Sequence, residues 1–195
     1  MVIDFYLDFI SPYVYLARGR LIDIASRQGC GIAYHPVAIM SLREQVGSTG
    51  PSNSQIPAKM AYFAKDYRRW AEYYGLPIAE TLAGFDTGEL NRGLLLAVDR
   101  GEADLYAQLA SDCVWRDGKD PAAAASLASI EAEMGWEAGI LSDFASSPEA
   151  QARYDAETKA ASECGVFGVP SFIIGDEMWW GNDRLDFLEC HLEAT

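Results

Sequence analysis

The sequence has no Cys-x-x-Cys pair, no cluster of histidines and no closely spaced set of metal-ligand residues. Its four cysteines and two histidines are scattered, as Cys30, Cys113, Cys164, Cys190, His35 and His191. A zinc site needs three or four clustered ligands, and a dithiol centre needs neighbouring thiols. We therefore expect no metal site and no redox pair, and we expect reduced cysteines that serve as small apolar side chains.

Positive charge and long apolar runs are also scarce. The 195 residues include 15 Lys and Arg against 29 Asp and Glu, which gives a net charge of −14 at pH 7. This sign disfavours binding to nucleic acid and to anionic lipid, and an anionic substrate would need a local cluster of Lys or Arg. No apolar run reaches the roughly 20 residues that span a bilayer, and no signal-like segment opens the chain. The sequence predicts a cytoplasmic protein with no nucleic-acid or membrane partner.

The chain begins with a strand that leads directly into a helix. Residues 2–9 are rich in β-branched and aromatic side chains, and Ser11-Pro12 supplies the start signals of a helix. Free N–H groups and the macrodipole at a helix N-terminus stabilise an anion by about 0.3–2 kcal/mol. Because the Ser11 hydroxyl adds a donor at the same place, we expect an anion-binding joint there.

The elements that follow fit an α/β fold. A helix over 12–28 that ends at Gly29 and a strand over 32–38 complete a β-α-β unit with two parallel strands. Residues 41–54 are expected to form a polar loop. Helical signals then run to about residue 163, with expected helices over 57–74, 91–100, 102–115, 120–135, 136–144 and 147–165.

The end of the chain is expected to return to the sheet. Gly175-Asp176 is a two-residue hairpin signal between strands over 171–174 and 177–180. Asp183 is placed to cap a last helix through Leu192.

This order of elements predicts a thioredoxin-like fold with an all-helical insertion. Residues 1–54 and 164–195 would form a discontinuous thioredoxin-like domain, and residues 55–163 the inserted helical domain. In the segment GVFGVPSF we predict a cis Val169-Pro170 bond, with the Val169 backbone facing Ser11 across the site.

Three segments carry a family resemblance: DFISPYVYLA, GVFGVPSF and WWGNDRLDFLE. They resemble those of the 2-hydroxychromene-2-carboxylate isomerases, which belong with the kappa-class glutathione transferases and the DsbA-type oxidoreductases. The resemblance implies glutathione as cofactor, a small aromatic carboxylate as substrate and a homodimer. It also implies interconversion of 2-hydroxychromene-2-carboxylate and trans-o-hydroxybenzylidenepyruvate in bacterial breakdown of naphthalene-type aromatics, by reversible addition of the glutathione thiolate.

The chain departs from the oxidoreductase branch at its central motif. Ser11 and Val14 occupy the positions at which that branch has Cys-x-x-Cys, so thiol–disulfide exchange by this motif is excluded. We expect Ser11 to be the catalytic residue, donating to the sulfur of a bound thiolate. It lacks an adjacent base that would make it a nucleophile. A plain helix N-cap is the alternative interpretation.

The resemblance also implies residues that bind glutathione. The Val169 backbone and Pro170 would pair with the cysteinyl part as a short added strand. Gly181, Asn182 and Asp183 would hold the γ-glutamyl end at the start of the last helix. A turn proline and simple helix capping are the structural alternatives.

A weaker match supplies candidate substrate-binding residues. Asn53 would make a polar contact and Lys59 would pair with a carboxylate, whereas Arg43, Gly84 and Phe85 lie in linkers that can face the site. An ordinary loop and a surface helix are the alternatives.

The expected helix over 57–74 is unusually aromatic. Most of the rings that recur at helical spacing are expected in the core, with one or two lining an apolar pocket; they are Tyr62, Phe63, Tyr67, Trp70 and Tyr74. Tyr73 is a further ring of the same helix. Because these rings fall on more than one helix face, the surplus predicts a homodimer contact made by the inserted helices.

Two other functions stay open at this point. A kappa-type transferase would conjugate glutathione to electrophiles and consume it. A non-catalytic thiol- or peptide-binding module would bind glutathione without turnover.

Overall fold

The first strand is the centre of the molecule because its side chains are buried on both sides. In the computed structural model, which describes residues 1–194 and all of their side chains except that of Ser54, β1 (Val2–Leu7) lies inside a four-stranded sheet of order β2-β1-β3-β4. Phe5 is fully buried and stacks on Phe172 of β3 with ring centroids 5.2 Å apart. Tyr6 is buried in a second cluster on the other face.

The pairing of the strands follows the prediction. β1 is parallel to β2 (Gly31–Pro36), and β3 (Ser171–Ile174) runs antiparallel to β1. β3 and β4 (Glu177–Trp180) form the expected hairpin. The thioredoxin-like arrangement of the sheet is confirmed.

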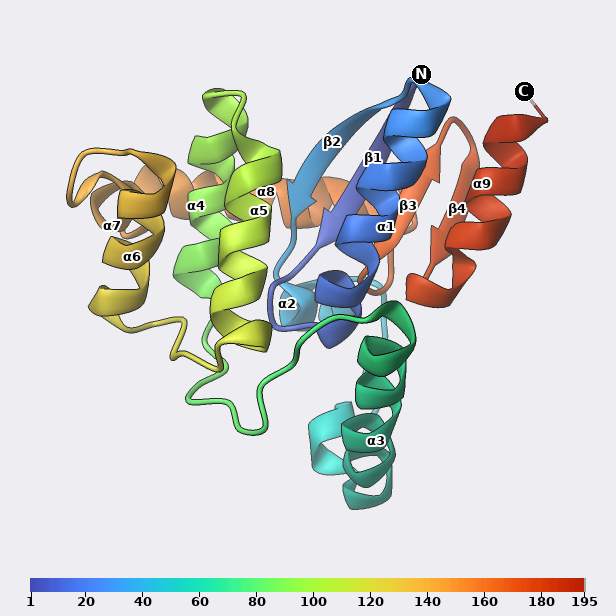
Figure 1. The fold of residues 1–195 in the computed structure, drawn as a ribbon, viewed down its shortest axis with the longest axis horizontal. Helices are drawn as coiled ribbons and strands as arrows, with labels where there is room; N and C mark the ends of the chain where they lie inside the picture. The colour runs from blue at the N-terminus through green and yellow to red at the C-terminus, as the bar shows by residue number, and fades with distance from the viewer. Residues whose placement is uncertain (195) are drawn as a thin grey trace.

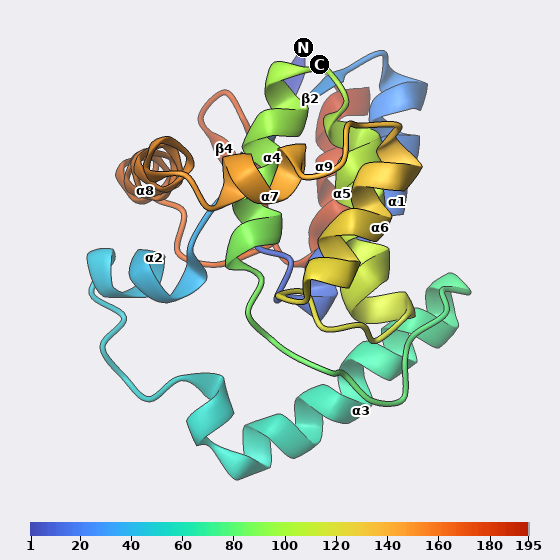
Figure 2. The ribbon, with the colours of Figure 1, turned by 90° about the vertical axis from the view of Figure 1, so that its left-hand side faces the viewer.

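Helices cover both faces of the sheet (Figures 1 and 2). On one face α1 (Pro12–Gln28) packs against α9 (Leu185–Glu193). On the other, α2 (Ile39–Gln45) packs against α8 (Pro148–Glu163), which also contacts β2. α1 therefore starts at the C-terminal edge of the central strand with its body against the sheet.

The remaining helices connect these layers. They are α3 (Pro57–Tyr74), α4 (Gly88–Asp99), α5 (Ala103–Ser111), α6 (Ala124–Met134) and α7 (Ile140–Ala145). Short turns of other helix types are η1 (Asn53–Gln55), the π-helical η2 (Asp112–Arg116) and η3 (Asn182–Arg184). In both ribbon views α3 runs along the underside, away from the sheet (Figures 1 and 2).

Helix ends marked by glycine were predicted best. Gly29, Gly75 and Gly135 adopt positive φ angles of 63°, 67° and 69° and end α1, α3 and α6. This left-handed conformation strains residues that carry a Cβ atom, so glycine is a reliable stop signal.

Three predicted boundaries were wrong, one of them that of the helix over 136–144, which begins only at Ile140 as α7. Residues 41–54 are not all loop, because α2 forms where Leu42 becomes fully buried against Val37 and Val166. Asp120-Pro121 does not open a helix: the chain continues as a turn, and α6 begins only at Ala124. For α2 long-range packing, and for Asp120-Pro121 hydrogen bonds within the turn, outweighed the local sequence pattern from which the boundary was predicted.

The division into two domains remains a prediction. The stretch 55–163 contains α3 to α8, as expected of a helical insertion. Its last helix, α8, packs on β2 and α2, so the end of that stretch also covers the sheet.

Candidate functional site

The site is built at the joint where β1 turns into α1. Ser11 stands at the N-cap position of α1, but its side chain makes no capping hydrogen bond. Its hydroxyl lies 3.5 Å from the carbonyl oxygen of Val169, and its N–H donates to Asp8 O at 3.0 Å. Since 3.5 Å is long for an O–H···O bond, the hydroxyl can turn to a better acceptor at little cost.

Two backbone N–H groups of the segments that meet at this joint have no acceptor among the described groups. Pro12 at the first helical position has no N–H, and no described group accepts the N–H of Tyr13 or of Val169. Together with the positive end of the α1 dipole, these groups suit an anion at the joint.

The Val169-Pro170 peptide bond is cis, as predicted. The contact between Val169 O and the Ser11 hydroxyl confirms that this backbone faces the joint across the site. Pro170 O in turn accepts the Gly181 N–H at 2.9 Å, which ties the segment that follows β4 to the same place. Gly181 has φ of 103°, a value that glycine adopts without strain, and this allows the chain to turn into η3.

Asn182 and Asp183 follow directly. Asn182 is buried, its Nδ2 lies 3.5 Å from the Tyr74 hydroxyl, and that hydroxyl donates to Asn182 O at 3.4 Å. The predicted capping role of Asp183 was wrong, because η3 intervenes and no side chain caps α9. The exposed Asp183 carboxylate instead pairs with Arg184 at 2.9 Å.

Tyr13 belongs to the site although the sequence reasoning did not select it. Its hydroxyl donates to Asp66 Oδ2 at 2.8 Å, and the Tyr62 hydroxyl donates to Oδ1 of the same carboxylate at 2.9 Å. Burial, followed by the bond to Asp66 and by nearby negative charge that includes Asp183, raises the pKa of Tyr13. The signal available in the sequence was its place two residues after Ser11, in the first turn of α1.

A cleft of about 470 Å³ lies between α1, α3 and the η3–α9 segment. This is within the range of ligand pockets. Its lining residues are Arg20, Asp66, Arg69, Trp70, Tyr73, Tyr74, Asp183 and Asp186. Trp70, Tyr73 and Tyr74 of α3 thus line a cleft together with charged side chains, whereas the sequence predicted an apolar pocket.

Of the five α3 rings that were expected mostly in the core, Tyr67, Trp70 and Tyr74 are half-buried and pack against the core cluster, and none is fully buried. Ala71 is the one buried residue of α3 among those described, and Tyr73 is 76% exposed. α3 packs along α1 and η1, away from the sheet, so only a narrow stripe of the helix meets the rest of the protein.

The candidate substrate residues lie in three places: the start of α3, α2 and the segment between α3 and α4. Lys59 Nζ donates to Asn53 Oδ1 at 3.3 Å at the start of α3, and Arg43 in α2 donates to Gly50 O at 3.2 Å.

Gly84 and the exposed Phe85 lie between α3 and α4, with Gly84 beside Asp120. No hydrogen bond or ion pair found among the described side chains joins any of the five substrate candidates to Ser11.

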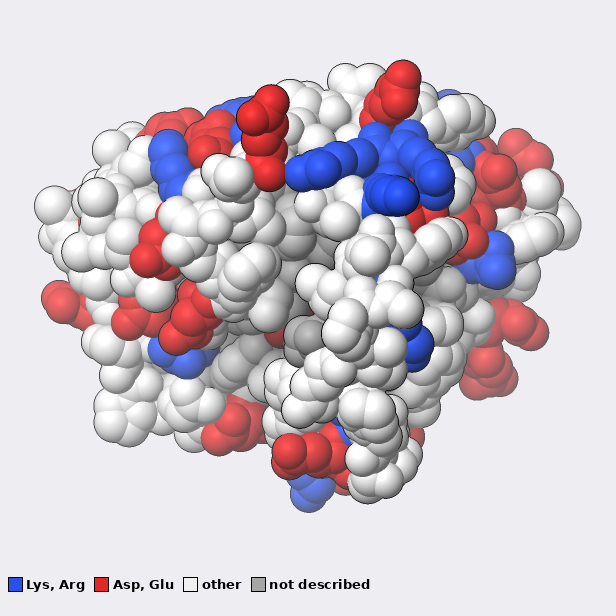
Figure 3. All heavy atoms as spheres, turned by 90° about the horizontal axis from the view of Figure 1, so that it is seen from below, with Lys and Arg blue, Asp and Glu red and all other residues white. Residues whose placement is uncertain are grey.

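Helix α3 carries more cations than carboxylates, four against Asp66 and Glu72. Its four cations are Lys59, Lys65, Arg68 and Arg69, and within residues 1–194 none of them forms a salt bridge. Figure 3, the view from below, shows several Lys and Arg side chains close together near the upper edge of this face and others standing singly among Asp and Glu. Many other cations are neutralised, as in the Arg153–Asp99 and Arg27–Glu189 pairs.

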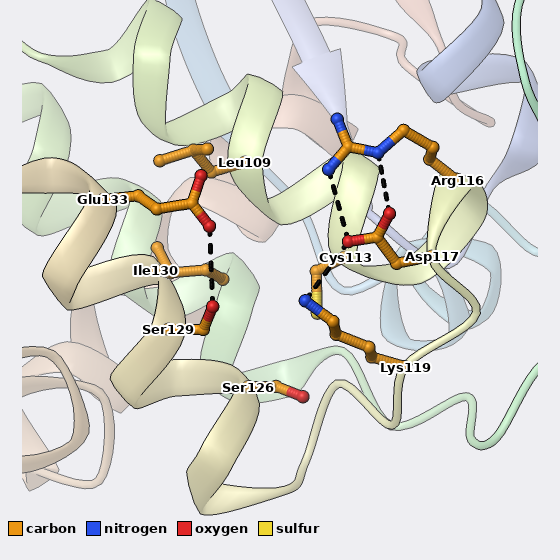
Figure 4. A pocket seen from close by; sticks show the side chains of 9 residues that line it. All are labelled: Leu109, Cys113, Arg116, Asp117, Lys119, Ser126, Ser129, Ile130 and Glu133. Atoms are coloured by element: carbon orange, nitrogen blue, oxygen red, sulfur yellow. Dashed lines mark hydrogen bonds and ion pairs between the residues drawn. The ribbon is translucent and has the colours of Figure 1, made fainter.

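A second hollow, beside Cys113, is too small for a ligand. It has a volume of about 10 Å³, roughly that of one water. Figure 4 shows Arg116 and Lys119 both directed at Asp117, so its cations are already paired. Burial raises the pKa of the Cys113 thiol, which keeps it protonated and inert.

Other kinds of site are not found in the described part of the chain. Residues 1–194 contain no group of His, Cys, Asp and Glu arranged to hold a metal ion, and all four cysteines are free. Their helices include none with the length and apolar character needed to cross a bilayer.

A strand–helix joint that faces a cis-proline across a thioredoxin-like sheet defines the class of this protein. The chain matches the model of the DSBA-like thioredoxin domain over residues 2–193, and it belongs to this family. Among solved structures of the same fold is a probable DsbA oxidoreductase from Streptomyces coelicolor, with 19% identity and a TM-score of 0.75 over 100% of this chain and 89% of that one.

Within this family its similar relatives are 2-hydroxychromene-2-carboxylate isomerases. It is 39% identical to that of Pseudomonas sp. (strain C18), over 97% of this chain and 89% of that protein. It is 38% identical to that of Sphingobium xenophagum, over 97% of each. A solved 2-hydroxychromene-2-carboxylate isomerase has a TM-score of 0.93 and 37% identity, over 100% of this chain and 95% of that chain. The family resemblance seen in the sequence is confirmed.

Proposed function

We propose that the protein is a glutathione-dependent isomerase that interconverts 2-hydroxychromene-2-carboxylate and trans-o-hydroxybenzylidenepyruvate. The isomerase activity is that of its relatives. The observation that carries the glutathione dependence is the geometry of Ser11, whose uncommitted hydroxyl stands at the N-terminus of α1 and faces the backbone of Val169. A thiolate held there is stabilised by a hydroxyl donor, backbone N–H groups and the helix dipole.

The reaction that fits this site is a reversible addition. The hemiketal ring of 2-hydroxychromene-2-carboxylate first opens: the bond between the ring oxygen and C2 breaks, the C2 hydroxyl gives up its proton and becomes the pyruvoyl carbonyl, and the ring oxygen takes up a proton as the phenol. The thiolate sulfur of glutathione then forms a bond to a carbon of the double bond conjugated to this carbonyl, and the electron pair moves to the carbonyl oxygen as an enolate. The former double bond is now single and rotates. Collapse of the enolate expels the thiolate and restores the double bond in the other geometry. Glutathione is regenerated, and Ser11 stabilises its sulfur at the start and the end of the cycle.

The neighbouring residues suit the rest of glutathione. The free Val169 N–H would pair with the cysteinyl backbone beside Pro170, and Asp183, with Gly181 and Asn182, would hold the charged γ-glutamyl end. Support comes from a cytosolic disulfide reductase, DsbM of Pseudomonas aeruginosa, which has this fold with 17% identity and a TM-score of 0.67, covers 100% of this chain and 98% of that chain, and was solved with GSH.

For the aromatic carboxylate, the unpaired cations of α3 provide the positive charge. Lys59, positioned by Asn53, is the proposed carboxylate partner. Arg43, Gly84 and Phe85 are proposed to border the substrate.

We also propose a cytoplasmic homodimer. Four free cysteines fit a reducing compartment. The exposed apolar side chains Met60, Tyr62 and Tyr73 of α3 fit an interface between two copies. Sedimentation equilibrium at micromolar protein should give twice the chain mass of 21.4 kDa, and a mass near 21.4 kDa would refute the dimer.

The test of the function is an ultraviolet-absorbance assay of the isomerisation with and without glutathione, combined with a count of free thiol. Turnover that requires glutathione and leaves its concentration unchanged is the expected result. Stoichiometric loss of thiol would indicate a conjugating transferase. Affinity for glutathione without turnover of any electrophile would indicate a binding module.

A further inference from the structure

The backbone just before Ser11 is held by side chains from distant helices. The Phe9 N–H donates to Asn91 Oδ1 at 3.1 Å, across 82 residues of sequence. The Phe9 carbonyl accepts from Trp115 Nε1 at 2.8 Å, across 106 residues. Both polar groups of Phe9 are thus fixed by the helical part of the chain, from α4 and η2.

The residue before it is fixed in the same way. Asp8 is 4% exposed, and its Oδ1 accepts from Asn91 Nδ2 at 2.7 Å, Thr87 Oγ1 at 2.8 Å and the Ile10 N–H at 3.1 Å. Its Oδ2 accepts from the Ile39 N–H at 3.3 Å. Burial raises the pKa of Asp8, although all four of these bonds favour the carboxylate.

Asn91 is the centre of this buried set. It is 1% exposed, and besides its bonds to Asp8 and Phe9 its Nδ2 donates to the Tyr154 hydroxyl of α8 at 2.9 Å. One amide therefore connects α4, α8 and the end of β1 with both its donor and its acceptor atoms in use.

Stability alone does not account for this arrangement. Burying a carboxylate without a cation is costly, and an apolar core of the same size would avoid that cost. What the buried bonds fix is specific: the peptide groups of Asp8, Phe9 and Ile10, which end at the Ser11 N–H bonded to Asp8 O. The direction in which Ser11 points follows from these groups.

We propose that Asp8, Asn91 and Trp115 are positioning residues that aim the Ser11 hydroxyl and the first N–H of α1 at the glutathione sulfur. This proposal rests on the proposed function, because it assigns these residues to the same sulfur site. It gives the helical part of the chain a role in the chemical step, in addition to providing the walls of the cleft. A shift of Ser11 by a fraction of an ångström weakens thiolate stabilisation and lowers kcat.

The test is a matched pair of tryptophan substitutions. Trp115→Phe removes the donor to Phe9 O while keeping an aromatic ring in the core. Trp136→Phe is the control: this indole is also buried, in the same helical region, and donates to Glu102 Oε2 at 2.7 Å, away from the joint. Trp115 donates to a neutral carbonyl, whereas Trp136 donates to a carboxylate and also packs under the Arg100 guanidinium at 4.9 Å. A purely structural cost is therefore at least as large in the control.

Trp115→Phe should lower kcat by roughly tenfold with little change in KM, and should raise the pH at which bound glutathione ionises. Trp136→Phe should leave both unchanged at an equal or greater loss of thermal stability. Tyr154→Phe, which removes one partner of Asn91, should move both quantities in the same direction by less, and it serves as the test if Trp115→Phe does not fold. Equal kcat and equal ionisation in all three variants and the wild type would overturn the positioning role.

Ser11→Ala and the double variant Ser11→Ala/Trp115→Phe separate this proposal from the proposed function. If Trp115 acts by aiming the hydroxyl, its substitution lowers kcat by a smaller factor once the hydroxyl is gone, because only the first N–H of α1 is then left to aim. Additive losses in kcat would contradict positioning while leaving the role of Ser11 intact. Full activity of Ser11→Ala would instead contradict the proposed function itself.

Discussion

The joint at Ser11 and the helix α3 border the same region but are built in opposite ways. Before the joint, Asp8 and Phe9 are buried, and side chains from two helical segments bond their polar groups. In α3 only Ala71 is buried among the described residues, and four cations have no ion-pair partner in residues 1–194.

The difference indicates that the two regions have different roles in catalysis. A fixed, fully bonded backbone holds one hydroxyl in place, and this acts on the chemical step. An exposed, unpaired cluster of cations attracts an anion to a protein whose net charge is −14, and this acts on binding. Substitutions at the joint should therefore change kcat, and substitutions in α3 should change KM and its salt dependence.

The largest expected effect is that of Ser11→Ala, which should lower kcat by roughly 10²-fold or more, on the scale of losing one charge-stabilising donor. Stability should be unchanged, because the Ser11 side chain makes no capping bond. The matched control is Ser147→Ala: Ser147 does cap α8 through the Ala150 N–H, so this variant should lose about 1 kcal/mol of stability and keep its activity. Steady-state kinetics and thermal unfolding of both variants check this. A Ser11→Ala variant that loses stability but keeps its activity, with a Ser147→Ala variant that loses activity, would contradict the account.

A smaller effect is expected from reversing one charge of α3. Arg69→Glu should raise KM for the aromatic carboxylate by up to about tenfold at low salt, with kcat kept, and the difference should shrink as salt screens the charge. Lys159→Glu in α8 changes the net charge equally at an exposed position that pairs with Glu163. Equal KM values for the two variants would show that α3 has no special role.

A smaller change still should follow from Tyr74→Phe. The Tyr74 hydroxyl makes only long bonds to Asn182, at 3.4 and 3.5 Å, so its loss should raise KM for glutathione about two- to threefold. Tyr73→Phe, at the 76% exposed neighbour, is the control and should have no effect. Steady-state kinetics at varied glutathione concentration would measure this change in KM. A change in kcat alone would contradict the assignment of Tyr74 to binding.

The face of the sheet away from the joint should affect stability only. His35 lies 3.0 Å from both Asp4 and Glu157; burial lowers the pKa of His35, but the bonds to these carboxylates outweigh burial and raise it above 6.5. The stabilisation is therefore complete below pH 6.5 and is lost as pH rises through the pKa of the folded state. Thermal unfolding against pH should show this loss in the wild type and not in His35→Gln, while the pH profile of activity stays the same in both.

The sequence predicted the parts of the site that rest on local chemistry. Each of these predictions depends only on neighbouring residues. The structure confirmed the start of α1 after Ser11, the cis Val169-Pro170 bond and the glycines that end α1 and α3. The Tyr13–Asp66 hydrogen bond joins positions 53 residues apart, and the hydrogen bond from the Phe9 N–H to Asn91 joins positions 82 residues apart. No local sequence pattern predicts contacts over such separations.

The same reason explains the errors. α2 forms because Leu42 finds a buried place against distant residues, and Asp183 fails to cap α9 because η3 follows the turn at Gly181. In both cases tertiary contacts decided between conformations that the local sequence permits.

The central claim is that the joint at Ser11 stabilises the thiolate of glutathione. The most direct test is the pH titration of the ultraviolet thiolate absorbance of glutathione bound to the wild type and to Ser11→Ala. We expect the bound thiol to ionise well below the ordinary cysteine pKa of about 8.5 in the wild type and closer to it in the variant. Bound glutathione that titrates like the free thiol in both proteins would contradict the account.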